Sequence, residues 1–239
     1  MLVRPRNPLN IGAAARAMSN FGAWQLRLVN PYSVAFREAR SAVGASELLK
    51  QAEDFKTLAE AVADCTLVVG TTAVRDRILQ HPLRKLNEDA GDEIRAGLGC
   101  GKVALLFGSE KIGLTNDDFS HCHWLLTIPT HQDHISMNLG QAVAVCLYEL
   151  ARASAQIATR GKSASVEGER AASGEVEQIG AVLLEALQIS GYVKPGNDSV
   201  SEKKVRRLLL RFRLQAMDAK VLLGMVRQIV WKLRQVAKK

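Results

Sequence analysis

The sequence predicts an α/β domain built on a parallel sheet and followed by a small helical extension. Within residues 1–157, short apolar segments that end in glycine, proline or a small polar residue alternate with helical stretches, as in repeated strand–helix units. Two of these segments, 66–69 and 103–107, are almost continuously apolar, which is typical of strands that helices cover on both faces. After residue 175 the apolar spacing becomes helical.

The individual elements are placed by their apolar pattern and by the residues that flank it. Asn138, followed by Gln141, resembles a capping box, and the apolar residues after it recur at helical spacing. Asn10 can cap a helix that stops near Gly22. We expect strands at residues 2–4, 26–29, 66–69, 103–107 and 124–128, and helices at residues 10–20, 46–58, 58–63 and from 138 onward.

The segment at residues 2–4 is shorter than an ordinary strand of about five or six residues. The residues that follow it behave as a strand-to-helix junction. We therefore expect a few further residues before Met1 in the native protein, which mass spectrometry of that protein would detect.

The composition indicates one full-sized core and a smaller appendage. Of the 239 residues, 47% are apolar and 23% are charged, which is ordinary for a globular chain. No apolar run approaches the roughly 18 residues that span a bilayer, and the first residues lack the apolar stretch of a secretory signal. We expect a cytoplasmic protein without a membrane segment.

The cysteines and histidines do not form a metal-site pattern. The four cysteines are far apart and include no CxxC pair, so we expect reduced and mostly buried thiols. His121 and His123 flank Cys122, and His131 and His134 are three residues apart. Neither group has a second ligand pair at the spacing of a zinc site, so we expect no metal.

Positive charge is concentrated at the end of the chain. Residues 194–239 contain thirteen Lys or Arg and three acidic residues, a net charge of +10, whereas the other 193 residues carry a net charge of −2. Such an end piece indicates binding to a polyanion, although a merely solvated basic face would have the same composition. We expect a Gly/Ser-rich linker at 158–175 and helices at 176–189, 201–215 and 218–236.

Three loops follow predicted strands, and ligands collect at the carboxyl ends of parallel strands. In residues 7–18, small side chains let the helix pack closely against another backbone, and Arg16 can meet a phosphate or carboxylate. In residues 128–142, a polar loop turns into the helix that begins at Asn138, where backbone N–H groups can receive a ligand. Taken alone, Arg16 could be a surface arginine and Asn138 an ordinary cap.

The loop at residues 106–115 superficially resembles a phosphate-binding loop. Leu114 stands where the pattern GxxxxGKS/T requires lysine. No GxGxxG follows any predicted strand. A nucleoside triphosphatase, a kinase and a dinucleotide-dependent oxidoreductase are therefore disfavoured.

In this order and spacing, the three loops resemble motifs 1, 2 and 3 of the SpoU/TrmH class of SPOUT RNA methyltransferases. The matching residues read NPLNIGAAAR at 7–16, LFGSEKIGL at 106–114 and IPTHQDHISMNLGQA at 128–142. The resemblance covers residues 2–150. The segment VVGTTA at 68–73 is similar to an element of the TrmJ-type members, and Gly191-Tyr192 together with residues 203–208 resembles their helical C-terminal extension.

The resemblance implies a fold, a cofactor and an assembly. Members of this class have an α/β domain with a C-terminal trefoil knot, act as homodimers and bind S-adenosyl-L-methionine in the knot. Glycine at position 108 would let the ligand approach the backbone, because it has no Cβ. Carried onto this chain, the cofactor-binding residues are Thr71, Thr72, Ala73, Gly108, Ile128, Ile135, Ser136 and Met137.

The implied reaction is methyl transfer to a ribose 2′-oxygen of RNA, and the implied catalytic residues are Arg16, Glu110, Ser136 and Asn138. Because a guanidinium stays protonated in proteins, we expect Arg16 to grip a phosphate and stabilise the developing alkoxide, leaving the phosphate or a water to take the proton. In this class the arginine can serve the cofactor of the neighbouring subunit. Glu110 would orient Arg16 or another basic group, or would cap a helix end, and Ser136 and Asn138 would shape the cofactor and ribose pocket.

The implied substrate is tRNA, with the ribose of nucleotide 32, a cytidine or uridine, as the target in the anticodon loop. Phosphate contacts from the basic extension would give affinity more than sequence choice. Two alternatives stay open: a TrmH-like enzyme that acts on another tRNA site or on rRNA, and a non-catalytic RNA-binding protein with the same fold. The residues expected to contact RNA are Asn10, Lys203, Lys204, Arg206, Arg207, Arg211 and Arg213.

Overall fold

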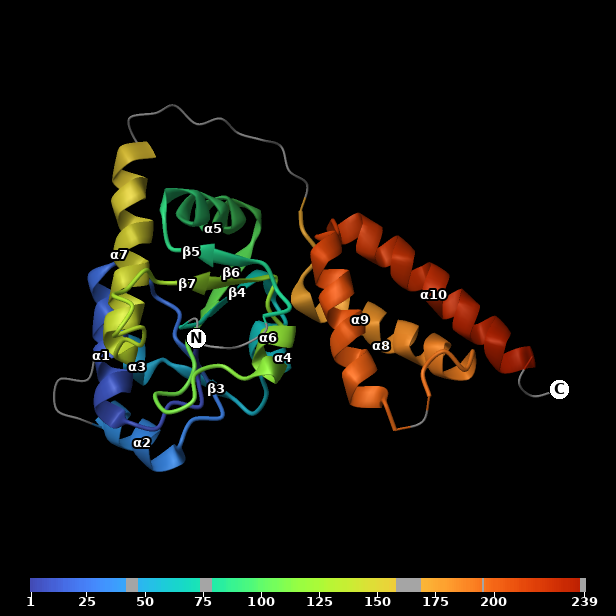
Figure 1. The fold of residues 1–239 in the computed structure, drawn as a ribbon, viewed down its shortest axis with the longest axis horizontal. Coiled ribbons are helices and arrows are strands. Elements are labelled where there is room, and N and C mark those ends of the chain that lie inside the picture. The colour runs from blue at the N-terminus through green and yellow to red at the C-terminus, as the bar shows by residue number, and fades with distance from the viewer. Residues whose placement is uncertain (42–46, 74–78, 158–168, 195, 237–239) are drawn as a thin grey trace.

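The computed structural model describes residues 1–41, 47–73, 79–157, 169–194 and 196–236 (Figure 1). Seven short strands in the described residues form two sheets in which every strand pair is parallel. The first sheet has the order β1 (Leu2–Val3), β2 (Arg27–Val29), β3 (Glu53–Phe55), and the second has the order β5 (Leu83–Lys85), β7 (Trp124–Thr127), β4 (Cys65–Thr71), β6 (Lys102–Leu106).

Backbone hydrogen bonds join the two sheets into one. The N–H of Val3 donates to the carbonyl of Phe107 at 2.8 Å, and the N–H of Phe107 donates to the carbonyl of Met1 at 2.9 Å. Strand β1 therefore lies beside β6, and the combined order is β5-β7-β4-β6-β1-β2-β3. The predicted parallel α/β sheet is confirmed.

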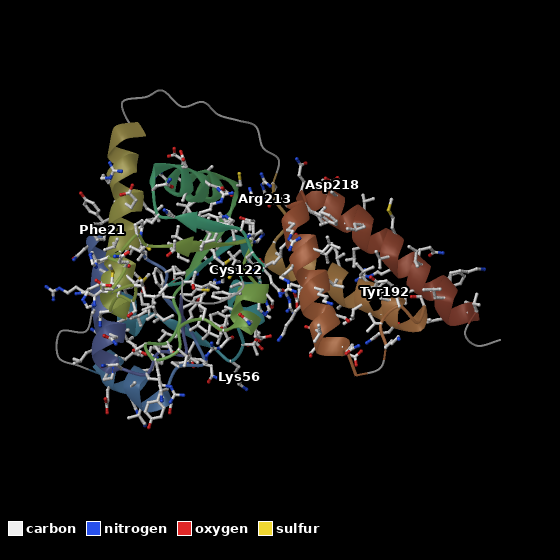
Figure 2. All side chains as sticks on the ribbon, in the orientation of Figure 1. Phe21, Lys56, Cys122, Tyr192, Arg213 and Asp218 are labelled. Atoms are coloured by element: carbon white, nitrogen blue, oxygen red, sulfur yellow. The ribbon has the colours of Figure 1, made fainter. Side chains whose placement is uncertain are left out.

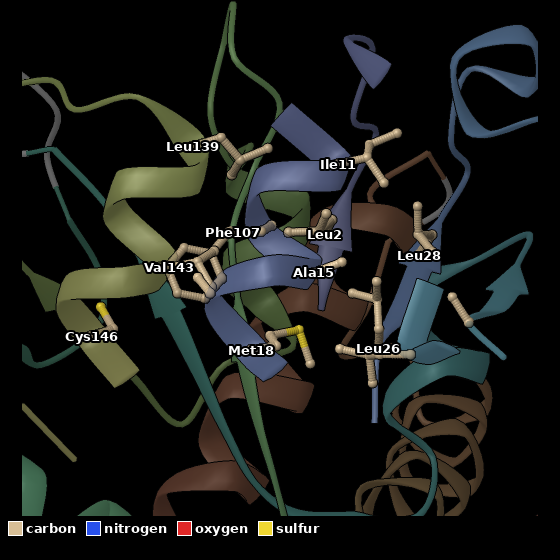
Figure 3. Packing of buried hydrophobic residues seen from close by; sticks show 14 of the residues in the cluster. Leu2, Ile11, Ala15, Met18, Leu26, Leu28, Phe107, Leu139, Val143 and Cys146 are labelled. Atoms are coloured by element: carbon tan, nitrogen blue, oxygen red, sulfur yellow. The ribbon is translucent and has the colours of Figure 1, made fainter. Parts of the chain in front are cut away.

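Helices cover both faces of this sheet. Neighbouring strand residues point to opposite faces, so Val68 belongs to one buried cluster and Leu67 and Val69 to another. Figure 3 shows the larger cluster, in which helices α1 and α7 pack on residues such as Phe107. In the α/β domain the described helices are α1 (Pro8–Asn20), α2 (Ser33–Ser41), α3 (Glu47–Lys50), α4 (Leu58–Val62), α5 (Glu88–Cys100), α6 (Asn116–Ser120) and α7 (Leu139–Ile157).

The structure corrects the expected helix at residues 46–58. Only Glu47–Lys50 is helical there, and Glu53–Phe55 forms β3, which pairs with β2. The side chain of Arg27 on β2 donates from Nε to Glu53 at 3.0 Å. Strand pairing at the edge of the sheet thus overrides the helical propensity of this segment.

The cap of helix α1 lies three residues before the expected cap, Asn10. The side chain of Asn7 accepts from the N–H of Leu9 at 2.9 Å, and Pro8 occupies the first helical position, where its missing N–H costs nothing. Asn7 is therefore the cap, and Asn10 lies within the helix.

The C-terminal extension is a group of three helices with a core of its own. They are α8 (Ser173–Ile189), α9 (Asp198–Phe212) and α10 (Ala216–Val236), which lie on the right in Figure 1. Ile179 and Leu209 are at the centre of this core. The expected helix at 201–215 is shifted, because Arg213 adopts a left-handed conformation with φ of 48° and ends α9. Of the expected linker, 173–175 is helical and 158–168 lies outside the described residues.

Several basic side chains of the extension contact the α/β domain. Arg206 was expected to bind RNA, but it is only 8% exposed, and its guanidinium donates to Glu177 at 2.8 Å and to Ser120 at 3.0 Å. An arginine already bonded in this way is a structural residue, so the expectation for Arg206 is wrong. Arg213 forms an ion pair with Glu93 at the junction of the two parts (Figure 2).

Two further residues of α9 contact the α/β domain. Nζ of Lys203 lies 2.9 Å from a carboxylate oxygen of Asp117, and Arg211 donates to the carbonyl of Gln80 at 3.4 Å. One face of α9 is therefore an internal contact. Within the described part of the chain, no helix is long and apolar enough to cross a membrane.

The junction also contains histidines that the fold keeps neutral. Burial lowers the pKa of His81 to about 4, and the positive charges of Arg207 and Arg211 lower it further. Burial and the charge of Arg213 likewise lower the pKa of His123 to about 4. In the unfolded chain both side chains titrate near 6.5. Between these values the unfolded state binds more protons than the folded state, so stability is lost as pH falls from about 6.5 to about 4.

We therefore expect the melting temperature to fall steeply across this pH window, above the range where most carboxylates titrate. The variant His81→Phe removes one of the two groups, and because Nε2 of His81 is buried without a hydrogen bond in the described residues, little else is lost. Thermal unfolding at several pH values should show a shallower slope for the variant. An identical slope for both proteins would rule out His81 as a source of acid sensitivity.

Candidate active site at the carboxyl ends of three strands

A cleft of about 410 Å³ opens where β4, β6 and β7 end. Its walls come from residues 71–73 after β4, 107–114 after β6 and 128–142 after β7. The structure brings together in this cleft all eight residues expected to hold the cofactor: Thr71, Thr72, Ala73, Gly108, Ile128, Ile135, Ser136 and Met137. Loops far apart in the sequence thus form one pocket, of the size that small ligands occupy.

The loop after β6 folds back tightly on itself at Gly108. A Cβ at this position would lie 2.0 Å from the carbonyl carbon of Gly113 and 2.2 Å from the nitrogen of Leu114. The turn is closed by the N–H of Gly113, which donates to the carbonyl of Ser109 at 2.8 Å, and Gly113 has a φ of 67°. Glycine is therefore required at 108 by the loop's own backbone, whereas the sequence suggested close approach of a ligand.

Hydrogen bonds hold the end of β4 between its neighbouring strands. The hydroxyl of Thr71 donates to the carbonyl of Leu106 at 2.8 Å, and the N–H of Thr72 donates to the carbonyl of Leu126 at 2.9 Å. These bonds tie the first wall of the cleft to the strands that carry the second and third. The cleft is therefore shaped by the sheet edge itself.

Asn138 caps α7, as expected from the sequence. Its Oδ1 accepts from the N–H groups of Gly140 at 2.9 Å and Gln141 at 3.4 Å. Its Nδ2 donates to Oδ1 of Asn10 at 2.9 Å, and Nδ2 of Asn10 donates to Glu110 at 3.0 Å. Side chains from all three motif loops are thus joined in one hydrogen-bonded chain.

Glu110 binds the start of α1 and does not contact Arg16. Its carboxylate accepts from the backbone N–H groups of Arg6 and Asn7, both at 3.2 Å, as well as from Asn10. Burial raises the pKa of Glu110, but these hydrogen bonds lower it by more, so the carboxyl group stays ionised. Of the roles considered for Glu110, the structure supports capping of a helix end, and no hydrogen bond or ion pair in the described residues joins it to Arg16.

Arg16 lies on an exposed face of α1, outside the cleft of its own chain. Among the described residues, no hydrogen bond or ion pair involves its guanidinium. The same face carries Leu9, which is 79% exposed. The expected close packing of α1 is confirmed at Ala13, because a Cβ on Gly140 of α7 would lie 2.6 Å from Cβ of Ala13. Arg16 is therefore held on helix α1 and does not line the cleft of its own chain.

Known proteins resemble this chain over most of its length. The family model described as the SpoU rRNA methylase family matches residues 1–148. The chain belongs to this family. The tRNA (cytidine/uridine-2'-O-)-methyltransferase TrmJ of Yersinia pestis (strain Pestoides F) is 35% identical over 234 residues, which is 96% of this chain and 90% of that protein. The TrmJ of Klebsiella pneumoniae is also 35% identical, over 96% of this chain and 94% of the relative.

Solved structures extend the family likeness to the whole chain. The crystal structure of TrmJ from Z. mobilis ZM4 is similar with a TM-score of 0.76 at 33% identity, covering 95% of this chain and 96% of that one. A probable methylase family protein from Haemophilus influenzae Rd KW20 has a TM-score of 0.57 at 30% identity and covers 98% of this chain and 97% of that one. The expected resemblance to TrmJ-type members of the SpoU family, including their helical extension, is confirmed. The knot and the homodimer stay predictions.

In this SpoU family member, a further ion pair lies next to the loop that forms one wall of the cleft, and sequence reasoning missed it. Arg4, at the end of β1, forms a two-pronged pair with Asp118, with Nη1 and Oδ1 3.0 Å apart. Asp118 is 3% exposed and also accepts from the N–H of Thr115 at 2.6 Å. Burial raises the pKa of Asp118, but Arg4 and Thr115 lower it by more. In the sequence, Thr115 and Asp118 have the spacing of a helix cap. This spacing gives no indication that Asp118 also contacts Arg4.

We expect Arg4→Ala to destabilise the protein by about 2–3 kcal/mol, because it leaves the buried carboxylate of Asp118 without its cation. Urea unfolding measures this change. The exposed neighbour Arg6 offers a control, since Arg6→Ala should stay within about 0.5 kcal/mol of the parent protein. Equal stabilities for Arg4→Ala and the parent would contradict the assigned role of the pair.

Proposed function

We propose that this chain is an S-adenosylmethionine-dependent RNA 2′-O-ribose methyltransferase acting on tRNA, with cytidine or uridine at nucleotide 32 as the target. The observation that carries the proposal is the cleft at the ends of β4, β6 and β7, where all eight expected cofactor residues meet. Relatives named tRNA (cytidine/uridine-2'-O-)-methyltransferase align with 96% of the chain, including its basic extension.

The cleft fits S-adenosylmethionine in size and in chemistry. Ile128, Ile135 and Met137 offer apolar surface, while Thr72 and Ser136 add polar groups beside backbone amides. When bound, the cofactor supplies a methyl group already activated on a sulfonium. The protein then has to orient the ribose and stabilise the charge that develops on its 2′-oxygen. Ser136 and Asn138 shape the ribose side of the pocket.

Arg16 stabilises that charge from a second copy of the chain. Because it lies outside the cleft of its own chain, it serves the cofactor held by the partner of a homodimer. The exposed apolar residues Leu9 on α1 and Tyr148 on α7, at 79% and 55% exposure, support contact between copies at these helices. The guanidinium holds the phosphate next to the target ribose, and the phosphate or a water takes the proton.

The helical extension supplies general affinity for tRNA. Its end piece, residues 194–239, has a net charge of +10, which includes Lys204 and Arg207 on α9 and four basic residues on α10. These residues remain when the contacts of α9 with the α/β domain are set aside. Contacts between these basic residues and the RNA backbone neutralise phosphates and release counterions, so RNA binding weakens as the salt concentration rises. The extension thus holds the tRNA body while the cleft receives the target nucleotide.

The test is an assay with radiolabelled methyl donor and tRNA transcripts that lack all modifications. The expected product carries one 2′-O-methyl group at nucleotide 32, located by nuclease mapping. A methyl group at another tRNA position or in rRNA would support the TrmH-like alternative. Calorimetry that detects no binding of S-adenosylmethionine would support the non-catalytic alternative and refute the proposal.

A further inference from the structure

A groove of about 590 Å³, separate from the cleft, lies at the carboxyl ends of β2 and β3. Its cationic lining residues are Arg37 and Arg40 on α2 and Lys56 after β3, and its one acidic lining residue is Asp54. All three cationic residues are exposed. The groove is therefore a concave site with an excess of positive charge, which attracts an anionic ligand.

One of these cations is held in place by the fold. Nη2 of Arg40 donates to the carbonyl of Lys50 at 2.9 Å, and its guanidinium lies over the ring of Phe36 with 5.3 Å to the ring centroid. Phe36 itself is 7% exposed, so the platform under the arginine is rigid. A fixed guanidinium loses little conformational entropy when it binds a phosphate.

The groove lies on the same edge of the sheet as the cleft. All strands are parallel, so the loops after β6, β1, β2 and β3 open on one side, in that spatial order. From β6 to β3 the distance across three strand spacings is about 14 Å. Two exposed cations lie along this path, Lys111 after β6 and Arg6 after β1. Figure 2 shows Lys56 at the lower edge of the α/β domain.

An aromatic side chain marks the boundary of the groove nearest to β1. Tyr32, between the lining residues Pro31 and Ser33, is 53% exposed. Its N–H donates to the carbonyl of Pro5 at 3.1 Å, which ties it to the loop after β1. Exposed aromatic rings beside cations are the combination on which single-stranded RNA stacks its bases and rests its phosphates.

We propose that this groove binds the RNA strand that flanks the target nucleotide, with Arg37 and Lys56 on its phosphates and Tyr32 against a base. The inference rests on the proposed function for its substrate. It adds a binding surface on the α/β domain, separate from the basic extension. Since the groove lies beside the cleft, it acts on the anticodon arm, whereas the extension acts on the rest of the tRNA.

The test variant is Arg37→Gln with Lys56→Gln, compared with Arg37→Lys with Lys56→Arg, which keeps both charges. Fluorescence anisotropy would measure the Kd for a labelled anticodon stem-loop across a salt series, and calorimetry would measure the Kd for S-adenosylmethionine. We expect the glutamine variant to bind the stem-loop about tenfold or more weakly at about 150 mM salt, with a salt slope smaller by about two. The charge-preserving variant should bind like the parent, and cofactor affinity should be unchanged in both.

An unchanged Kd and salt slope in the glutamine variant would overturn the inference, as would an equal loss in the charge-preserving variant. Phosphate binding that is lost in the glutamine variant while stem-loop binding is kept would make the groove a small-anion site and also overturn it. Failure of the proposed function is distinguishable: a parent protein that binds the stem-loop through Arg37 and Lys56 but transfers no methyl group would retain the groove and refute the enzyme.

Discussion

Replacement of Arg16 by alanine should reduce methyl transfer by roughly 100- to 1000-fold, the usual cost of removing one group that stabilises a developing negative charge. The variant should fold like the parent, because the side chain is exposed and the described residues give it no hydrogen bond. It should also bind S-adenosylmethionine normally, since Arg16 does not line the cleft of its own chain. Single-turnover rates with tRNA transcripts, together with calorimetry of the cofactor, would measure both quantities.

The variant Arg16→Lys separates charge from shape. Lysine keeps the positive charge but lacks the planar fork that meets two phosphate oxygens at once. We expect it to recover only part of the rate. Full activity in Arg16→Ala would remove this residue from the mechanism, whatever the lysine variant does.

Mixed dimers would tell whether Arg16 works across the subunit boundary. Subunits with Arg16→Ala keep an intact cleft, and subunits with a disabled cleft keep Arg16. If the arginine serves the partner's cofactor, mixing these two inactive proteins should restore about a quarter of the parent activity, because random mixing makes half of the dimers mixed and each holds one complete site. No recovery in verified mixed dimers would place Arg16 and the cofactor in the same subunit.

The central sheet could be predicted from the sequence because each of its main strands is recognisable from its own apolar residues. Apolar runs such as 66–69 and 103–107 must be buried on both faces wherever they occur in an α/β domain. Strand β3 could not be predicted in this way, because two of the three residues in Glu53–Phe55 are acidic and the segment becomes a strand only by pairing with β2. Its conformation is a consequence of tertiary structure, which local patterns do not carry.

The same distinction separates the parts of the site that could be predicted from those that could not. Motif order indicated the eight lining residues of the cleft, and the cap at Asn138 follows from a local rule. The sequence left the role of Glu110 open between a basic partner and a helix cap, because only the fold shows that Asn10 and the start of α1 face Glu110. The pair between Arg4 and Asp118 joins residues 114 positions apart, so no spacing could indicate it.

Charge counting likewise predicted the basic extension but not how its residues are used. Arg206 and Lys203 belong to the same basic stretch of sequence as Lys204, yet the first two bind Ser120 and Asp117 in the α/β domain. A helix places residues three or four positions apart on one face and their neighbours on another. Which face docks is decided by the partner surface, and this information is absent from the helix sequence itself.

Replacement of Gly108 by alanine should abolish cofactor binding, with a Kd for S-adenosylmethionine raised by about 100-fold or more, corresponding to about 3 kcal/mol. A Cβ at this position would lie 2.0 Å from the backbone of Gly113, so the loop must open and the wall of the cleft that it forms must move. Calorimetry measures the affinity, and circular dichroism checks that the fold survives.

Gly12→Ala is the matched control, because a Cβ there meets no atom within 4 Å and alanine is favoured over glycine inside a helix such as α1. That variant should bind the cofactor like the parent and unfold at the same or a slightly higher temperature. If Gly108→Ala bound the cofactor as well as Gly12→Ala does, the closed turn between Gly108 and Gly113 could not be what shapes the cleft. Because the clash is with backbone and not with a flexible side chain, no rotamer change relieves it, so the loop and the binding site it forms should be lost together.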